Sequence, residues 1–134
     1  WQHVLEPLYG YMLLAKKVYE LNNNSNDNEL FTEPFNFGPK SNSNKSVEDL
    51  LKEILTHWSG KYKVEFSKDF FHEAGLLNLV SDKSFEMLNW QQKISFEETV
   101  SKTVNWYKDY YSGISAIECC LKDINFYEDL IDEL

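Results

Sequence analysis

Hydrophobic residues recur at helical spacing along most of this chain. Leu5 and Leu8 begin one stripe that continues at intervals of three and four residues to Tyr19, a pattern typical of an amphipathic helix with one buried face. Four further stretches follow the same rule, and the last carries acidic residues on its opposite face. The predicted helices cover about residues 5–20, 47–58, 82–88, 96–111 and 120–134.

Three of these helices begin at recognisable start signals. Ser46 is followed three residues later by Asp49, and Ser95 by Glu98. In such a pair the serine side chain accepts a hydrogen bond from the helix backbone while the acid favours the positive end of the helix dipole. We also expect Asp82 to cap the brief helix that ends at Leu88.

Short extended segments are expected between the helices. Phe35–Pro39 reads as a short strand closed by its Gly and Pro, and Tyr62–Phe66 alternates apolar and polar residues as a strand with one buried face does. Residues 76–79 suggest a third short segment. Polar tracts around 22–28 and 41–46 predict loops. The expected fold class is α/β: one small, mainly helical unit with short strands over residues 1–134, with no internal repeat or linker.

Composition narrows the possible partners. The net charge is -9, which disfavours nucleic acid as a partner because phosphate backbones are bound by cationic surfaces. All 13 basic residues are lysines, so a phosphate would have to be held by lysine, backbone amides or a residue from outside this chain. No apolar run reaches the ~20 residues of a membrane helix, and no signal peptide is visible. We therefore expect a cytoplasmic protein.

The spacing of residues gives no support for a dinucleotide-binding site, a metal site or a disulfide. The five glycines stand singly, which excludes a complete dinucleotide-binding fingerprint. His3, His57 and His72 are not at metal-ligand spacing. The adjacent Cys119 and Cys120 cannot easily pair with each other, and we predict that both are buried thiols. No catalytic or metal-binding residue is predicted.

Four residues are candidates for ligand binding. Trp1 and His3 stand at the entry of the first helix, where an exposed aromatic ring could pack on a base or ribose. His72 and Glu73 fall in a loop and could offer a donor and a carboxylate to ligand hydroxyls. The competing readings are that Trp1 plugs the core and that the His-Glu pair occurs by chance.

Several short blocks of residues, spread along nearly the whole chain, are informative as a set. They are Trp1-Gln2-His3-Val4-Leu5-Glu6-Pro7-Leu8 with Gly10-Tyr11, Phe35-Asn36-Phe37-Gly38-Pro39, Val47-Glu48, His72-Glu73-Ala74, Asp82-Lys83, Leu88-x-Trp90 and Thr103-Val104-x-Trp106-Tyr107. In these blocks and in their order, the chain resembles the C-terminal third of CDP-glucose 4,6-dehydratases, which belong to the extended short-chain dehydrogenase/reductase family.

The resemblance implies a two-lobed enzyme whose N-terminal Rossmann lobe holds NAD and the catalytic Tyr and Lys. This chain resembles the second lobe, which closes over the nucleotide sugar and lacks the Rossmann part. In the family an arginine that contacts the diphosphate stands two residues before the position of Trp1. Trp1 then corresponds to a nucleotide-facing aromatic residue, with His3 beside it, and Glu73 to an acid that binds a ribose hydroxyl, with His72 as its neighbour.

Four positions depart from the family pattern. Asn89 stands where a glycine is usual, Gln92 where proline is common, and Val80 where the family has an acid. Asp82 stands where the family has a serine and can still cap the helix as serine would. The change at Val80 puts a local hydrogen bond in doubt.

We interpret the chain, which opens on Trp1 without a methionine, as part of a larger enzyme. The parent would convert CDP-glucose to CDP-4-keto-6-deoxyglucose using NAD, as a possible homodimer, and this part alone would be inactive. Two alternatives stay open: a lobe of another nucleotide-sugar epimerase or dehydratase, and a stand-alone interaction module. An upstream Rossmann fingerprint in the same reading frame would support an enzyme, and a stop codon followed by a separate start would support the module.

Overall fold

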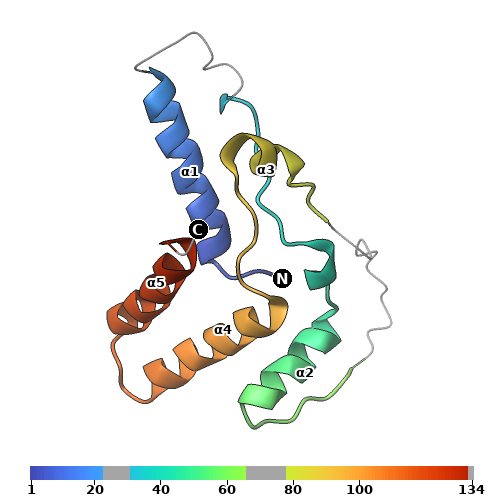
Figure 1. Cartoon of the computed structure of the whole chain (residues 1–134). Helices are drawn as coiled ribbons and strands as arrows, with labels where there is room; N and C mark the ends of the chain where they lie inside the picture. Colours follow the sequence, from blue (N-terminus) through green and yellow to red (C-terminus); the bar gives the residue numbers. More distant parts are fainter. Residues whose placement is uncertain (23–30, 66–77, 133–134) are drawn as a thin grey trace.

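The regular secondary structure of the chain is entirely helical in the part that the structure describes (Figure 1). That part of the computed structural model comprises residues 1–22, 31–65 and 78–132. No strand occurs within these residues, so the predicted α/β class is wrong. The elements are α1 (Leu5–Asn22), the 3₁₀ turn η2 (Ser41–Ser43), α2 (Val47–His57), α3 (Asp82–Leu88), α4 (Phe96–Tyr111) and α5 (Ala116–Asp132).

The helices themselves agree with the hydrophobic pattern to within a few residues, except that α5 begins earlier than residue 120. At α2 and α4 the full capping boxes form as predicted, with Ser46 and Ser95 as N-caps. At α5, the Ser115 hydroxyl accepts a bond from the Glu118 amide at 3.2 Å, and the Glu118 carboxylate accepts one from the Ser115 amide at 3.2 Å. This third pair explains the earlier start, because it satisfies backbone donors at the helix entry.

The start of α3 differs from the prediction. Ser81, not Asp82, occupies the N-cap position, and its hydroxyl makes no cap bond because it instead accepts a hydrogen bond from the Gly38 amide at 2.9 Å. The end of α3 is closed by Asn89, whose φ of 52° lies in the left-handed region. Asparagine tolerates this conformation better than most residues, so it can end the helix at this position.

The first predicted strand, Phe35–Pro39, forms no strand in the structure. Its backbone groups hydrogen-bond to side chains and not to a neighbouring strand. The Gln2 amide nitrogen donates to the Phe37 carbonyl at 2.9 Å, and the Ser81 hydroxyl accepts from the Gly38 amide. Backbone groups need partners, but those partners need not come from a strand. The segment that the sequence predicted as a strand therefore exists as a connection held by side chains, and it forms no sheet within the described residues.

The second predicted strand is also absent from the described residues. Tyr62 and Val64, which the pattern assigned to a buried face, are both exposed. Residues 61–65 form no ladder, and Phe66 lies outside the described part. Among the described residues no strand lies beside this segment, so its period-two pattern has no ladder there to stabilise it.

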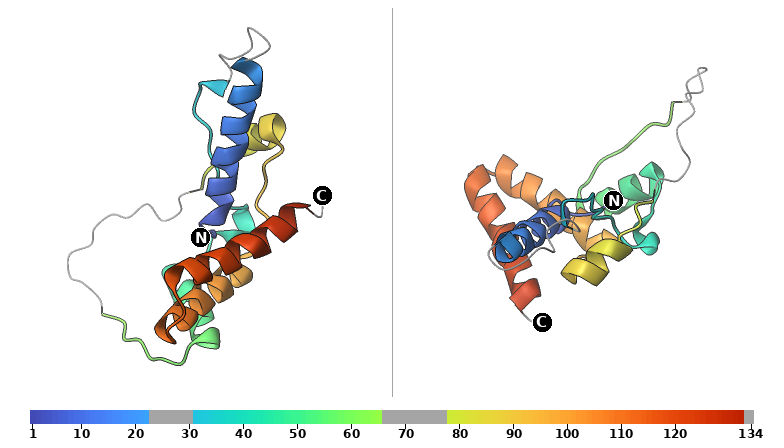
Figure 2. Two further views of the ribbon diagram at one scale, coloured as in Figure 1. Left: turned by 90° about the vertical axis from the view of Figure 1, so that its left-hand side faces the viewer. Right: turned by 90° about the horizontal axis from the view of Figure 1, so that it is seen from above.

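The helices pack in three pairs: α1 with α3, α2 with α4, and α4 with α5. Figures 1 and 2 show α1 standing beside α3, with α4 between α2 and α5. The α2–α4 pair contains an apolar cluster in which Leu50 and Ile54 pack against Phe96, Val100 and Val104. The connection between α3 and α4 runs between these groups, and it carries the residues that organise the candidate site.

Candidate functional site

The carboxylate of Glu6 joins three distant parts of the chain. Glu6 is completely buried at the start of α1. Its Oε1 accepts hydrogen bonds from the backbone amides of Lys93 at 2.8 Å and Ile94 at 2.7 Å, and its Oε2 accepts one from the Tyr127 hydroxyl at 2.8 Å. Burial raises the pKa of Glu6 and, together with the Glu6 charge, that of Tyr127. Glu6 is therefore a structural clamp that fixes residues 93 and 94.

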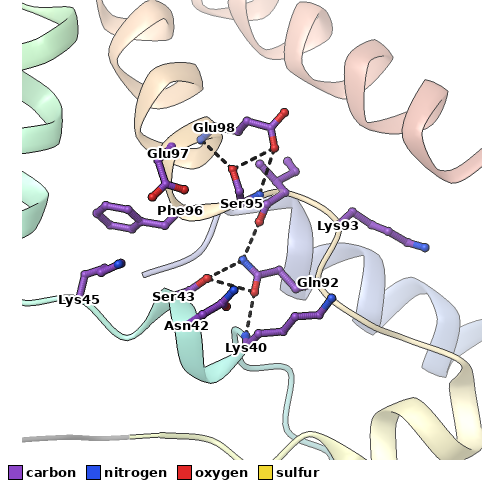
Figure 3. Close-up of a pocket in the computed structure, with 11 residues that line it drawn as sticks. Lys40, Asn42, Ser43, Lys45, Gln92, Lys93, Ser95, Phe96, Glu97 and Glu98 are labelled. Atoms are coloured by element: carbon purple, nitrogen blue, oxygen red, sulfur yellow. Dashed lines mark hydrogen bonds between the residues drawn. The ribbon is translucent and has the colours of Figure 1, made fainter.

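A second buried clamp lies next to the first. The Gln92 side chain is buried, and its Oε1 accepts a hydrogen bond from the Lys40 amide at 2.8 Å. Its Nε2 donates to the Ile94 carbonyl at 2.6 Å and to the Ser43 hydroxyl at 3.3 Å. Figure 3 shows this amide at the centre of the network. Gln92 thus ties the η2 segment to the chain that leads into α4.

A cavity of about 340 Å³ surrounds the Gln92 network (Figure 3). We call it the lysine pocket, because Lys40, Lys45 and Lys93 contribute to its walls from two separate segments. Figure 3 shows Lys45 on one side of the network and Lys93 on the other. The full lining is Lys40, Asn42, Ser43, Lys45, Gln92, Lys93, Ile94, Ser95, Phe96, Glu97 and Glu98.

The lining of the lysine pocket is net positive, whereas the whole chain is net negative. Three lysines and two glutamates line the pocket, and the chain carries a net charge of -9. One of the two acids, Glu98, accepts hydrogen bonds from the amide and hydroxyl of Ser95 at 3.2 and 3.0 Å and keeps its charge, because both donors are neutral. The lining therefore carries one more cation than anions, which suits an anionic ligand.

Trp1 does not line the lysine pocket, but it hydrogen-bonds to the backbone of two residues that do. Its indole Nε1 donates to the Lys45 carbonyl at 2.9 Å, and its amino group donates to the Ser43 carbonyl at 3.4 Å. The Trp1 side chain is held in place, yet the residue is 47% exposed. It does not plug the core, so the competing reading of this residue is not supported.

His3 lies elsewhere. It is buried in an apolar groove of about 410 Å³ between the start of α1, α4 and α5. Its Nε2 is 3.9 Å from the Asp123 carboxylate. Burial lowers the pKa of His3 and raises that of Asp123. The structure therefore does not bring Trp1 and His3 to one cavity. The groove is lined by His3, Val4, Leu5, Leu8, Thr103, Trp106, Tyr107, Cys120, Asp123 and Ile124.

The remaining sequence predictions have mixed outcomes. His72 and Glu73 lie outside the described residues, so their proposed role stays a prediction. Cys119 is buried as predicted, but Cys120 is exposed and lines the apolar groove; both are free thiols. Within the described ranges, no group of three His, Cys, Asp or Glu side chains could hold a metal ion. No described helix is long and apolar enough to cross a membrane.

Sequence reasoning missed the lysines of the pocket. Lys40 and Lys45 flank a polar tract that we had interpreted only as a loop, and Lys93 precedes a helix by three residues. Their spacing forms no motif, because the fold brings residues about 50 positions apart to one cavity. The available signal was the absence of arginine, which left lysine as the side chain able to bind a phosphate.

Comparison with known proteins gives one informative similarity. The chain is 31% identical to the CDP-glucose 4,6-dehydratase of Salmonella typhimurium over 128 residues, which make up 95% of this chain and 34% of that protein. The chain thus spans about a third of the length of this relative. No family model matches the chain. The similarity relates the chain to a nucleotide-sugar dehydratase, and the substrate and activity of a whole protein do not follow from it.

Proposed function

We propose that this chain is the nucleotide-sugar-binding part of an NAD-dependent dehydratase of the CDP-glucose 4,6-dehydratase family, with a cytoplasmic location. Two findings support the proposal: the similarity extends along 95% of the chain, and a cationic pocket lies beside an exposed aromatic ring. The observation that carries it is the position of Trp1, which is hydrogen-bonded to the backbone of Lys45 at the edge of the lysine pocket.

In the proposed complex the diphosphate of the nucleotide lies against the lysines, and its base or ribose lies against Trp1. The ammonium groups of Lys40, Lys45 and Lys93 attract the diphosphate, as point charges without the paired geometry of a guanidinium. The exposed face of Trp1 packs against the base or ribose. An arginine from outside this chain would complete the grip on the phosphates, in line with the resemblance. His72 and Glu73 stay candidates for contacts to the ribose.

The described residues do not fit NAD. A dinucleotide site of the Rossmann type needs a strand followed by a glycine-rich turn and a helix, and the described part contains no strand. We therefore assign NAD, the chemical step and any homodimer contact to a separate lobe of the parent enzyme. The chain described here binds and orients the nucleotide sugar but performs no hydride or proton transfer.

The proposal predicts weak binding of CDP by this chain, and weaker binding of cytidine, because cytidine lacks the phosphates that the lysines attract. Both ligands are titrated while chemical shifts are followed by NMR. Lys93→Gln should weaken binding of CDP more than that of cytidine, whereas Lys16→Gln, an exposed change on α1, should alter neither. Trp1→Ala should weaken binding of both.

Three results would contradict this assignment. Equal affinity for CDP and cytidine would remove the role of the lysine pocket. Turnover of CDP-glucose by this chain with added NAD would show that the chemistry does not need a separate lobe. An unaltered CDP affinity in Trp1→Ala would leave the pocket without its proposed aromatic surface.

A further inference from the structure

We propose that Gln92 is a positioning residue that sets the arrangement of the lysines for anion binding, an inference that rests on the proposed function of the lysine pocket. It touches no ligand in this proposal. It acts by holding together the two backbone segments that carry Lys40 and Lys93 (Figure 3).

Both polar atoms of the Gln92 amide are engaged across the two segments. On the η2 side, Oε1 takes the backbone amide of Lys40 at 2.8 Å, and Nε2 donates to the Ser43 hydroxyl at 3.3 Å. On the α4 side, Nε2 donates to the carbonyl of Ile94 at 2.6 Å, the residue directly after Lys93. One side chain thus sets the spacing between two cationic residues that are 53 positions apart in sequence.

Neighbouring contacts make this spacing rigid. Gln92 is 8% exposed, so its hydrogen bonds face little competition from water. On the α4 side, the Glu6 carboxylate also holds the amides of Lys93 and Ile94. The α4 side is therefore clamped twice, by Glu6 and by Gln92. Gln92 provides the connection from that fixed side to Lys40.

The chemistry of glutamine is needed for this role. A proline or an apolar side chain at position 92 could not accept the hydrogen bond from the Lys40 amide. The Lys40 segment would then have to find another partner for a part-buried donor, at a cost in free energy. When the backbone segments that carry the two lysines are loosely held, binding a phosphate costs more conformational entropy than when the segments are fixed.

The test compares Gln92→Met, which keeps the length of the side chain and removes its amide, with Gln91→Met at the exposed neighbouring position. The probes are inorganic pyrophosphate and cytidine, followed by NMR. We expect Gln92→Met to weaken pyrophosphate binding about tenfold through lost preorganisation and to leave cytidine binding unchanged. The Lys40 amide should also exchange faster with solvent. Gln91→Met should bind both probes as the wild type does.

A variant that is less stable but keeps the Gln92 hydrogen bonds distinguishes a positioning role of Gln92 from a general effect of lower stability. Val104→Ala, which removes volume from the apolar cluster between α2 and α4 at a residue outside the pocket lining, should retain pyrophosphate binding. Ser43→Ala removes only one partner of the Gln92 amide, and a smaller weakening of pyrophosphate binding is expected. It serves as the second variant if Gln92→Met does not fold.

The outcomes are distinguishable. Unchanged pyrophosphate binding in both Gln92→Met and Ser43→Ala, or an equal loss in Val104→Ala, would overturn the positioning role while leaving the lysine pocket intact. A wild-type chain that binds no pyrophosphate would overturn the anion site itself, and this inference with it.

Discussion

Glu6 and Gln92 are polar residues for which the sequence predicted no structural role. Each is buried, and each satisfies backbone amides of a segment far away in sequence. Such groups stabilise a fold mainly because losing one leaves its partners unpaired in a low dielectric. At the residue scale, the site is therefore built by side chains that replace the backbone ladder of a sheet.

The raised pKa of Glu6 gives a pH dependence with a definite sign. Burial is the largest cause of the shift from 4.5, so the folded state binds the Glu6 proton more tightly than the unfolded state does. The stability that Glu6 contributes is full below about pH 4.5 and is lost as pH rises through its folded pKa. We expect Glu6→Gln to remove this loss, because an amide can still accept from Lys93 and Ile94.

The measurement is the urea midpoint between pH 4.5 and 7. The midpoint of Glu6→Gln should rise relative to the wild type with increasing pH, whereas Glu86→Gln, an exposed change on α3, should run parallel to the wild type. Parallel curves for Glu6→Gln would show that Glu6 does not titrate differently in the two states. Glu6→Ala, which strands three buried donors, should lose about 3 kcal/mol or more.

At the scale of elements, helix α1 is shaped by its contact with the extended segment Phe35–Pro39. The ring of Phe37 lies directly over Gly10, and a Cβ built there would stand 2.6 Å from Phe37 Cε1. Phe37 also meets the ring of Trp90 edge to face, with centroids 5.1 Å apart. Glycine at this position is therefore a packing requirement, in the middle of a helix where alanine is intrinsically preferred.

Gly10→Ala accordingly sets two effects against each other. Alanine gains about 1 kcal/mol in helix propensity, but overpacking against a buried ring costs about 1–3 kcal/mol. Since Phe37 and Trp90 are both buried and leave the ring little room, we expect a net loss of stability in urea unfolding.

Gly60→Ala is the matched control. Its new Cβ would meet Leu55 at an ordinary contact distance of 3.4 Å, so little change is expected. A Gly10→Ala variant as stable as the wild type would show that α1 and the Phe37 segment can separate without cost.

At the scale of the whole molecule, large apolar side chains gather around the groove that contains His3. Val4, Leu8, Tyr107 and Ile124 line it and are all exposed. An apolar surface of this kind binds hydrophobic dyes and promotes self-association. An exposed apolar groove of this kind is what we expect if the chain is part of a larger protein.

We expect the chain to enhance the fluorescence of an anilinonaphthalene dye under native conditions. The double variant Val4→Gln with Leu8→Gln should reduce the signal, because both residues belong to the groove. Val64→Gln changes an exposed valine outside it and should leave the signal unchanged. A wild-type chain that is strictly monomeric by sedimentation and silent to the dye would contradict the expectation.

The sequence by itself determined the helices, because their evidence is local. Spacing of apolar residues predicted α1, α2 and α4, and Ser46 and Ser95 predicted two of their starts correctly. A resemblance to CDP-glucose 4,6-dehydratases was also readable along the chain, and the 31% identity to one such protein over 95% of the chain agrees with it.

Only the tertiary structure decided which groups hydrogen-bond to the backbone between the helices and which residues line the same cavity. Extended backbone at Phe35–Pro39 looks the same in sequence whether it pairs with a strand or with side chains such as Gln2. Lys40 and Lys93 form no local pattern, and they become neighbours of one pocket through a buried amide at Gln92. Periodicity follows from local geometry, whereas hydrogen-bond partners far apart in sequence follow from the packing of the whole chain.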